Sequence, residues 1–228
     1  MELLKIKALK KEYITGSEKL EVLKDVNLVI NNGETIAITG ESGSGKTTIL
    51  NLVGGLDIPS KGKIIFCDDN KSIDITKLTE EQLAGYRRDA VGFIFQFHFL
   101  LKDFTAIENV MMPSYIAGRA KDTAYKQALK LIVDVGVEHR KDAYPSELSG
   151  GEKQRIAVAR ALMNDSKIII ADEPTGNLDE RNSGIVEDLL FNVVAKYNRT
   201  LLLVTHDRNL AKRANRHFEL IHGVLVEQ

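Results

Sequence analysis

The chain has 228 residues, of which 43% are hydrophobic and 28% are charged, and its formal net charge is -1. These values are typical of a soluble globular protein, and a net charge so close to zero does not favour nucleic acid or acidic lipid as a partner. The single Cys67 excludes an internal disulfide framework, no apolar run approaches the length of a transmembrane helix, and Met1–Lys5 lacks the pattern of a signal peptide. We therefore expect any membrane connection to go through a partner.

The first third of the chain is expected to consist mainly of short strands. Alternating side chains predict a strand over 2–9, followed by a loop that holds Tyr13, Gly16 and Ser17. Further strands are predicted over 22–30, 34–39, 61–66 and 72–75, with turns at Asn31–Gly33 and Asp68–Asn70. This part of the chain therefore predicts antiparallel strands beside one central parallel strand.

Residues 40–48 read GESGSGKTT and fit the pattern G-x-x-x-x-G-K-[ST] of a phosphate-binding loop, the P-loop. The loop lies between the predicted strand 34–39 and a helix that stops at Gly54-Gly55. Its glycines allow backbone N–H groups to approach phosphate, Lys46 can reach the terminal phosphates, and the Thr47 hydroxyl can bind Mg²⁺. The predicted phosphate-binding residues are Gly40, Glu41, Ser42, Gly43, Ser44, Gly45, Lys46, Thr47 and Thr48.

The middle of the chain is predicted to be largely helical. Thr79–Gln82 is a capping box for a helix that ends near Arg88, and a strand is predicted over 91–95. Strand signals are then absent from 97 to 160, which we interpret as a helical subdomain inserted into an α/β core. Three features indicate helices in this subdomain. A capping box lies at Thr105–Glu108, and a helix is predicted from Ser149 to Met163. Between them an apolar helix face, with a stop at Gly136, is formed by Ala124, Ala128, Leu131, Ile132 and Val135.

The last part of the chain returns to alternating strands and helices. Buried strands are predicted over 167–171, before Asp172, and over 200–205, before His206. Between them a helix is expected with Ile185, Leu189, Val193 and Tyr197 on one face; a short helix near 207–215 and a hairpin around His222-Gly223 follow. This order predicts a doubly wound α/β core, whose ligands bind at the carboxyl ends of the strands.

The residues at these strand ends match the needs of phosphate chemistry. Asp172 can hold Mg²⁺, commonly through water, and Glu173 can orient a water for attack on the γ-phosphate. His206 can donate a hydrogen bond to a γ-phosphate oxygen, and the neutral amide of Gln96 can touch both metal and water. Without the P-loop, a strand-end Asp-Glu pair would be interpreted as a solvated turn and a lone histidine as structural. The predicted metal ligands are Thr47, Gln96 and Asp172, and the predicted catalytic residues are Lys46, Gln96, Glu173 and His206.

A second glycine-containing helix start lies at Leu148–Arg155, which reads LSGGEKQR. Ser149 can cap the helix, and Gly150 and Gly151 leave the backbone bare enough to contact phosphate. An ordinary capping box is the alternative interpretation. Two phosphate-binding helix starts in one chain suggest a head-to-tail dimer in which each site is built from both copies.

Taken together, these motifs resemble those of the ATP-binding cassette (ABC) ATPases, over essentially the whole chain. Residues 40–48 match the Walker A motif, 148–152 the LSGGE signature, 168–172 the Walker B motif and 177–179 the D-loop. Three single residues match further motifs: Tyr13 matches the adenine-stacking aromatic, Gln96 matches the Q-loop glutamine and His206 matches the switch histidine. The resemblance implies an α/β P-loop NTPase (RecA-like) core with an antiparallel β subdomain and an inserted helical subdomain. It also implies a single ABC ATPase domain, with the core at 1–96 and 161–228 and the helical subdomain at 97–160.

The resemblance implies a mechanism as well. Two copies would enclose two Mg-ATP, each between the P-loop of one copy and the signature of the other, with Ser149, Gly150, Gly151, Glu152 and Asp179 contributing to binding. Glu173 would act as general base, while His206 and Lys46 stabilise charge. The implied partners are integral membrane permease subunits on separate chains, the implied location is the cytoplasmic face of the cell membrane, and nucleic acid is not an expected partner.

Within the family, residues 172–179 and 108–113 look most like the branch of lipoprotein-releasing, macrolide-efflux and antimicrobial-peptide-resistance ATPases. Two departures are Glu152, where the signature more commonly has Gln, and Phe97-His98 after the Q-loop glutamine. A regulatory, mechanotransmitting ATPase of the cell-division type, without transported cargo, is the alternative function. Phe97, Phe99 and Leu100 form either local hinge packing or an apolar patch that receives a coupling helix of the permease.

Overall fold

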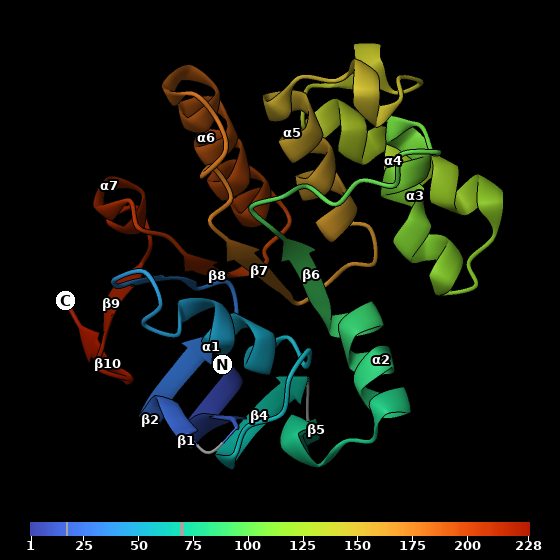
Figure 1. Ribbon diagram of the computed structural model, residues 1–228. Helices are drawn as coiled ribbons and strands as arrows, with labels where there is room; N and C mark the ends of the chain where they lie inside the picture. The colour runs from blue at the N-terminus through green and yellow to red at the C-terminus, as the bar shows by residue number, and fades with distance from the viewer. Residues whose placement is uncertain (17, 69–70) are drawn as a thin grey trace. The chain divides into compact units, whose positions relative to one another are not determined.

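The computed structural model describes residues 1–16, 18–68 and 71–228 (Figure 1). The chain divides into two compact units, one of residues 1–87 and 200–228 and the other of residues 88–199. The predicted boundaries of the helical subdomain, 97 and 160, stay predictions.

The first unit contains an antiparallel sheet that includes strands from the start of the chain. Its strands are β1 (Glu2–Thr15), β2 (Glu18–Asn31), β4 (Lys61–Asp68) and β5 (Lys71–Asp74), in the order β2-β1-β4-β5. The predicted loop at Tyr13 was wrong, because β1 continues through this residue and pairs it with Leu20 of β2. Alternation over 2–9 identified only the first part of this strand. Ser17, Asp69 and Asn70, which were assigned to a loop and a turn, lie outside the described residues.

A second set of strands in this unit surrounds the predicted P-loop strand. The elements are β3 (Thr35–Thr39), α1 (Lys46–Val53), the 3-10 turn η1 (Ile75–Lys77), α2 (Glu80–Ala90, of which 88–90 belong to the other unit), β8 (Thr200–Val204), α7 (Arg208–Ala211), β9 (Arg216–Ile221) and β10 (Val224–Glu227). β3 runs parallel to β8 and β9, and β10 forms the predicted hairpin with β9. All five residues of β3 except Thr35 are buried, so this strand gives the loop after it a rigid base.

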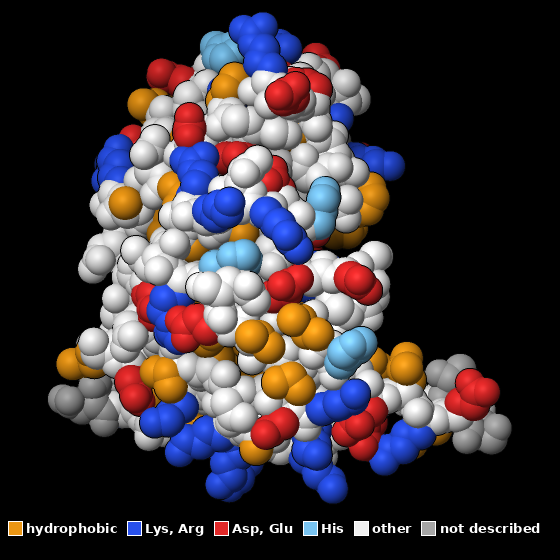
Figure 2. Space-filling model, turned by 90° about the vertical axis from the view of Figure 1, so that its left-hand side faces the viewer, with side chains coloured by type: hydrophobic (Ala, Val, Ile, Leu, Met, Phe, Trp, Pro, Cys, Tyr) orange, Lys and Arg blue, Asp and Glu red, His pale blue; other side chains and the backbone are white. Residues whose placement is uncertain are grey.

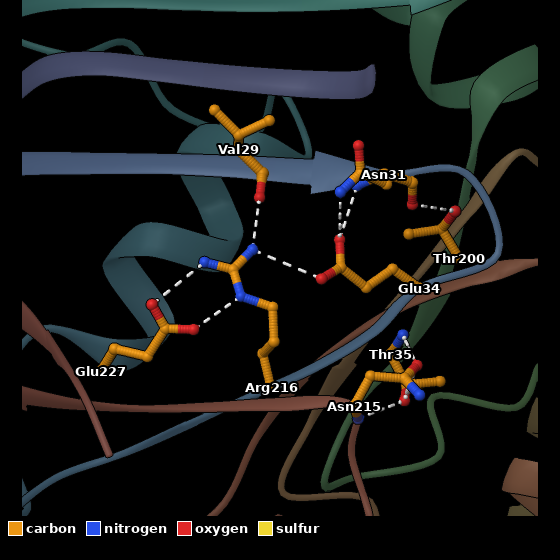
Figure 3. Close-up of polar contacts among 8 residues, drawn as sticks. All are labelled: Val29, Asn31, Glu34, Thr35, Thr200, Asn215, Arg216 and Glu227. Atoms are coloured by element: carbon orange, nitrogen blue, oxygen red, sulfur yellow. Dashed lines mark hydrogen bonds and ion pairs between the residues drawn. The ribbon is translucent and has the colours of Figure 1, made fainter. Parts of the chain in front are cut away.

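The turn that leads into β3 is held by a polar network around Arg216 (Figure 3). The guanidinium group donates to Glu34 Oε1 at 3.3 Å, to the carbonyl of Val29 at 3.0 Å, and to both carboxylate oxygens of Glu227. Glu34 Oε2 accepts from the backbone N–H of Asn31 at 2.7 Å. Ends of β2, β3, β9 and β10 are therefore tied together at the amino end of β3, opposite the end that carries the P-loop.

The second unit combines two parallel strands with four helices. Its elements are β6 (Val91–Ile94), α3 (Ala106–Ile116), α4 (Lys121–Asp134), the 3-10 turns η2 (Glu138–Arg140) and η3 (Pro145–Glu147), α5 (Gly150–Ala161), β7 (Ile168–Asp172) and α6 (Glu180–Lys196). The capping box of α3 is formed as predicted, since the Thr105 hydroxyl accepts from the N–H of Glu108 and the Glu108 carboxylate accepts from the N–H of Thr105.

Hydrophobic periodicity identified one helix face correctly and misplaced another. In α4 the predicted residues are buried, and Gly136 adopts φ 68° where the helix stops. In α6 the predicted face was wrong by about one residue: Val186, Leu190, Val193 and Val194 are buried, whereas Ile185 is 45% exposed. Three pairs of adjacent apolar residues in this helix, Ile185-Val186, Leu189-Leu190 and Val193-Val194, fit two faces almost equally well, so sequence alone could not decide between the faces.

The surface carries a mixture of charges. On the face drawn in Figure 2, Lys and Arg side chains are interspersed with Asp and Glu, in keeping with 31 basic and 32 acidic residues. Among the described residues, no helix combines the length and the apolar character needed to cross a membrane.

Candidate nucleotide-binding site

The predicted P-loop follows β3 directly, and its glycines adopt backbone conformations that other residues rarely take. Gly40 has φ 152° and Gly45 has φ 106°. A Cβ atom on Gly40 would lie 2.8 Å from the carbonyl of Leu220, and one on Gly45 would lie 2.6 Å from Val22 Cγ1. The loop therefore needs glycine both for its dihedral angles and for the space around it.

Two features of this loop fit a phosphate group. The Lys46 ammonium donates to the carbonyls of Gly40 and Glu41, both at 2.9 Å, so it is already folded over the loop. The Ser44 hydroxyl is buried and has no hydrogen-bond partner among the described residues. In addition α1 starts at Gly45 without a side-chain cap, which leaves its first turn able to donate to an anion.

His206 follows β8, the parallel neighbour of β3. The pairing of Ile38 with Val204, and the hydrogen bond from the N–H of Thr205 to the carbonyl of Ile38 at 3.2 Å, bring the carboxyl ends of the two strands together. The structure therefore places His206, whose side chain is exposed, at the same sheet edge as Gly40.

Tyr13 approaches the P-loop from β1. Burial raises the pKa of Tyr13, a hydrogen bond with the Thr48 side chain lowers it, and a hydrogen bond with Asp57 raises it, so that the phenol stays neutral. The phenol donates to Asp57 Oδ2 at 2.9 Å, and the Lys11 ammonium lies 4.8 Å from the ring centroid. Through Thr48, the predicted adenine-stacking residue is connected to the helix that carries the P-loop.

The second unit brings together three other predicted residues. Asp172 ends β7, and Glu173 follows it with φ 45°, a left-handed conformation that is uncommon outside glycine and typical of functional turns. Gly176 lies in the same turn, where an added Cβ would lie 3.1 Å from Gln96 Nε2 and 3.5 Å from Glu173 Cβ. Asn177 also donates to the carbonyl of Gln96 at 3.0 Å. Gln96 and Glu173 therefore both lie beside Gly176.

The signature helix α5 begins with a complete capping box. The Ser149 hydroxyl accepts from the N–H of Glu152 and donates to Glu152 Oε2 at 2.9 Å, and the N–H of Ser149 donates to the same oxygen at 2.8 Å. Arg140 donates to Glu152 Oε1 at 3.0 Å. Burial raises the pKa of Glu152, but the hydrogen bonds from Ser149 and Arg140 outweigh it and lower the pKa to about 2. The carboxylate is therefore ionised at neutral pH.

The start of α6 packs against the glycines of the signature. Asp179 caps this helix by accepting from the N–H of Asn182 at 3.0 Å, which lowers the pKa of its carboxyl group. An added Cβ on Gly150 would lie 3.1 Å from Leu178 Cδ2, and one on Gly151 would lie 2.9 Å from Asn182 Oδ1. The signature and the D-loop therefore form one continuous surface of the second unit.

The oxygen donors among the predicted metal ligands, the Thr47 hydroxyl and the Asp172 carboxylate, are of the kind that Mg²⁺ prefers. Among the described residues, no group of three or more His, Cys, Asp or Glu side chains is arranged to hold a metal.

Sequence reasoning missed four residues that hold the predicted ones in place: Lys11, Asp57, Arg140 and Asn182. Asp57 is 44 positions from Tyr13 in the sequence, and Arg140 is 12 positions from Glu152. No local pattern links such pairs. For Asn182 a signal existed, because Asp179 is a capping residue directly before the helix, and such a side chain accepts from the backbone N–H three residues further on.

The strand-loop-helix geometry of residues 35–53, together with a glycine-rich signature helix, defines a P-loop ATPase of the ATP-binding cassette type. The ABC transporter family model matches residues 23–176, and the chain belongs to this family. It is an ATP-binding ATPase with the predicted fold, and the prediction of the family is confirmed.

Similar proteins match this chain along nearly its whole length. The lipoprotein-releasing system ATP-binding protein LolD of Treponema denticola is 50% identical over 97% of this chain and 96% of its own length. LolD of Xanthomonas euvesicatoria is 46% identical over 98% of this chain and 90% of its own length. Among solved structures, the dimeric, post-hydrolysis cassette MJ0796 bound to ADP and phosphate superimposes with a TM-score of 0.88, at 37% identity, over 99% of this chain and 98% of that one.

Proposed function

We propose that this chain is the ATP-hydrolysing subunit of a lipoprotein-releasing complex at the cytoplasmic face of the cell membrane. Two copies associate head to tail around two Mg-ATP, and the closing and opening of the dimer moves permease subunits on separate chains. The observation that carries the proposal is the 50% identity to the Treponema denticola lipoprotein-releasing ATPase across almost the full length of both chains. It favours lipoprotein release over macrolide or peptide export and over the regulatory function without cargo.

The predicted residues divide the work of hydrolysis in this proposal. Residues 40–48 bind the phosphates, with Lys46 stabilising negative charge, and Tyr13 stacks on adenine. Bound Mg²⁺, held by Thr47, Asp172 and Gln96, would neutralise phosphate charge. Glu173 accepts the proton of the attacking water, and His206 donates to the γ-phosphate. Residues 149–152 and Asp179 of the second copy complete the site.

The dimer is tested by replacing the proposed base. Glu173→Gln removes the proton acceptor but keeps the shape of the side chain, so we expect ATP to remain bound and the protein to shift from monomer to dimer. Size-exclusion chromatography with ATP and Mg²⁺ measures this shift, with ADP as the matched control nucleotide. An elution volume that remains monomeric with ATP would argue against two copies enclosing the nucleotide.

A pocket in the second unit supports a docking site for the permease. It has a volume of about 560 Å³ and is lined by residues 97–100, Lys102, Pro145, Ser146 and Lys153. Phe97 is 61% exposed and Phe99 is 64% exposed, so these rings are not merely buried hinge packing. Arg160 donates to the carbonyls of His98 and Phe99, both at 2.7 Å, which fixes the backbone that presents them.

The same pocket suggests the character of the docking segment. An apolar helix face fits the phenylalanines, and an acidic residue fits the lysines at the rim. Phe99→Asp should reduce co-purification with the permease while leaving the ATPase activity of the isolated subunit within about twofold. Ile116→Asp, at a 69% exposed position of α3, is the control. Unchanged co-purification of Phe99→Asp would refute the docking site.

The cargo is tested with the permease. Purification of the complex should yield membrane subunits with a large extracytoplasmic domain, and the complex in proteoliposomes should release a diacylated or triacylated lipoprotein in an ATP-dependent manner. Glu173→Gln should abolish release. Association with a membrane partner that releases no lipoprotein under these conditions would favour the regulatory alternative.

A further inference from the structure

Tyr13 is held by a small network that the P-loop motif does not contain. Its phenol donates to Asp57 Oδ2 at 2.9 Å, and the Lys11 ammonium donates to Asp57 Oδ1 and to the carbonyl of Ile58, both at 2.7 Å. Asp57 Oδ1 also accepts from the N–H of Ile58 at 2.7 Å. The carboxylate therefore has a fixed orientation, and both of its oxygens are engaged.

As a result, the two faces of the Tyr13 ring have different surroundings. The Lys11 ammonium lies over one face, 4.8 Å from the centroid, and Lys11 is only 8% exposed. Tyr13 itself remains 36% exposed. A cation over an aromatic ring is attracted to its negative face, so this face is already used and a planar ligand has the opposite face available.

We propose that Lys11 and Asp57 are positioning residues for the nucleotide base: they lock the Tyr13 ring so that its exposed face receives adenine. The inference rests on the proposed function, in which Tyr13 stacks on ATP. The contacts of the pair are with Tyr13 and the backbone of Ile58, so it acts on base affinity and leaves the phosphate chemistry of the P-loop unchanged.

The expected size of the effect follows from the cost of ordering a side chain on binding. A ring that is already fixed loses little conformational freedom when the base stacks on it, whereas a ring released from Asp57 and Lys11 must be ordered by the ligand. Ordering one side chain weakens binding by roughly 2- to 10-fold. The loss should affect nucleotides and spare ligands that have no base.

The experiment compares ATP with inorganic tripolyphosphate, a probe that has the phosphates and lacks the base. Affinities are measured by isothermal titration calorimetry with Mg²⁺ on the full chain, and ATPase activity gives KM and kcat. The variants are Lys11→Met, Asp57→Asn and Tyr13→Phe, with Lys10→Met as the control on the same strand. Tyr13→Ala measures the contribution of the ring itself.

We expect Lys11→Met and Asp57→Asn to raise the Kd and KM for ATP roughly 2- to 10-fold, with kcat and tripolyphosphate affinity within twofold of the parent chain. Tyr13→Phe keeps the ring and loses the hydrogen bond to Asp57, so it should raise the Kd and KM for ATP over the same range even if Lys11→Met fails to fold. Unchanged ATP affinity in Asp57→Asn and Tyr13→Phe, or an equal loss for tripolyphosphate, would overturn the proposal.

Failure of this inference can be distinguished from failure of the proposed function. If Tyr13→Ala weakens ATP binding while Asp57→Asn and Tyr13→Phe do not, the stacking residue stands and only the positioning pair is refuted. If Tyr13→Ala leaves ATP affinity unchanged, the adenine contact is refuted, and the positioning pair with it.

Discussion

The two helix starts assigned to phosphate are built in opposite ways. α1 has Gly45 as its N-cap and no side-chain cap, next to a buried Ser44 hydroxyl that has no hydrogen-bond partner in the part of the chain that the structure describes. α5 begins at Ser149 with a capping box in which the serine hydroxyl and its N–H are both bonded to Glu152. The P-loop therefore presents open donors, whereas the signature is already satisfied within its own chain.

This difference suggests a division of labour between the two. A loop with open donors gains most of its hydrogen bonds when phosphate arrives, so it can bind nucleotide by itself. A capped helix start gains less, because Ser149 must turn its hydroxyl proton from the carboxylate to the phosphate. We expect the P-loop to determine nucleotide affinity. We expect the signature to contact the nucleotide only after a second copy has closed over the P-loop.

The largest effect is expected from Lys46→Ala in the P-loop. The ammonium that spans the carbonyls of Gly40 and Glu41 would be lost, and with it the positive charge available to the γ-phosphate. We expect ATP hydrolysis to fall by about 100-fold or more, as measured by phosphate release. Lys63→Ala, at an exposed position of β4, is the control, and normal turnover in Lys46→Ala would refute the assignment of this lysine to the phosphates.

A pair of glycine substitutions compares the two helix starts directly. Gly45→Ala adds a Cβ at φ 106° and 2.6 Å from Val22 Cγ1, so the free energy of unfolding should fall by about 2–4 kcal/mol. Gly151→Ala lies within a helical turn, and its close neighbour, Asn182 Oδ1 at 2.9 Å, belongs to a side chain that can move. Gly151→Ala should lower the free energy of unfolding by no more than about 1 kcal/mol.

Urea denaturation of both variants measures the difference. If Gly151→Ala proves as destabilising as Gly45→Ala, the packing of Asn182 against the signature is more rigid than the single contact suggests. The contrast between an open, strained loop and a regular, capped helix would then fail.

Local patterns were sufficient to predict much of this molecule. The P-loop strand, the Thr105 capping box, the helix cap at Ser149 and the stop at Gly136 depend on neighbours within a few residues, and all have the predicted structure. Alternation ended too early in β1, because Tyr13 is in a strand whose polar and apolar residues no longer alternate. The face of α6 was misplaced because its apolar residues fit two stripes.

Contacts between distant residues were beyond sequence reasoning. The roles of Asp57 beside Tyr13 and of Arg140 beside Glu152 depend on segments that meet only after folding. A motif identifies which side chains could touch a nucleotide, and it contains nothing about the side chains that orient them. The assigned catalytic and metal-binding roles of Gln96, Asp172, Glu173 and His206 stay predictions.

The carboxylate of Glu152, which completes the signature cap, should stabilise the fold in a pH-dependent way. The pKa of Glu152 is about 2 in the folded chain, against 4.5 as its ordinary value. A carboxyl group whose pKa is depressed by folding contributes stability above its unfolded pKa, and this contribution is lost as the pH falls through the folded pKa. The window for Glu152 is therefore from about pH 4.5 down to about pH 2.

Glu152→Gln tests this expectation, because the amide can still accept a hydrogen bond from Ser149 but carries no charge. The difference in unfolding free energy between the parent chain and Glu152→Gln should be about 1–2 kcal/mol at pH 7, and it should shrink as the pH falls from 4.5 to 2. Arg140→Gln should reduce the pH dependence, since this guanidinium is one of the groups that lowers the pKa of Glu152. If the difference in unfolding free energy stays constant over this pH range, the charge of Glu152 does not contribute to stability, and the cap acts through the shape and hydrogen bonds of this side chain alone.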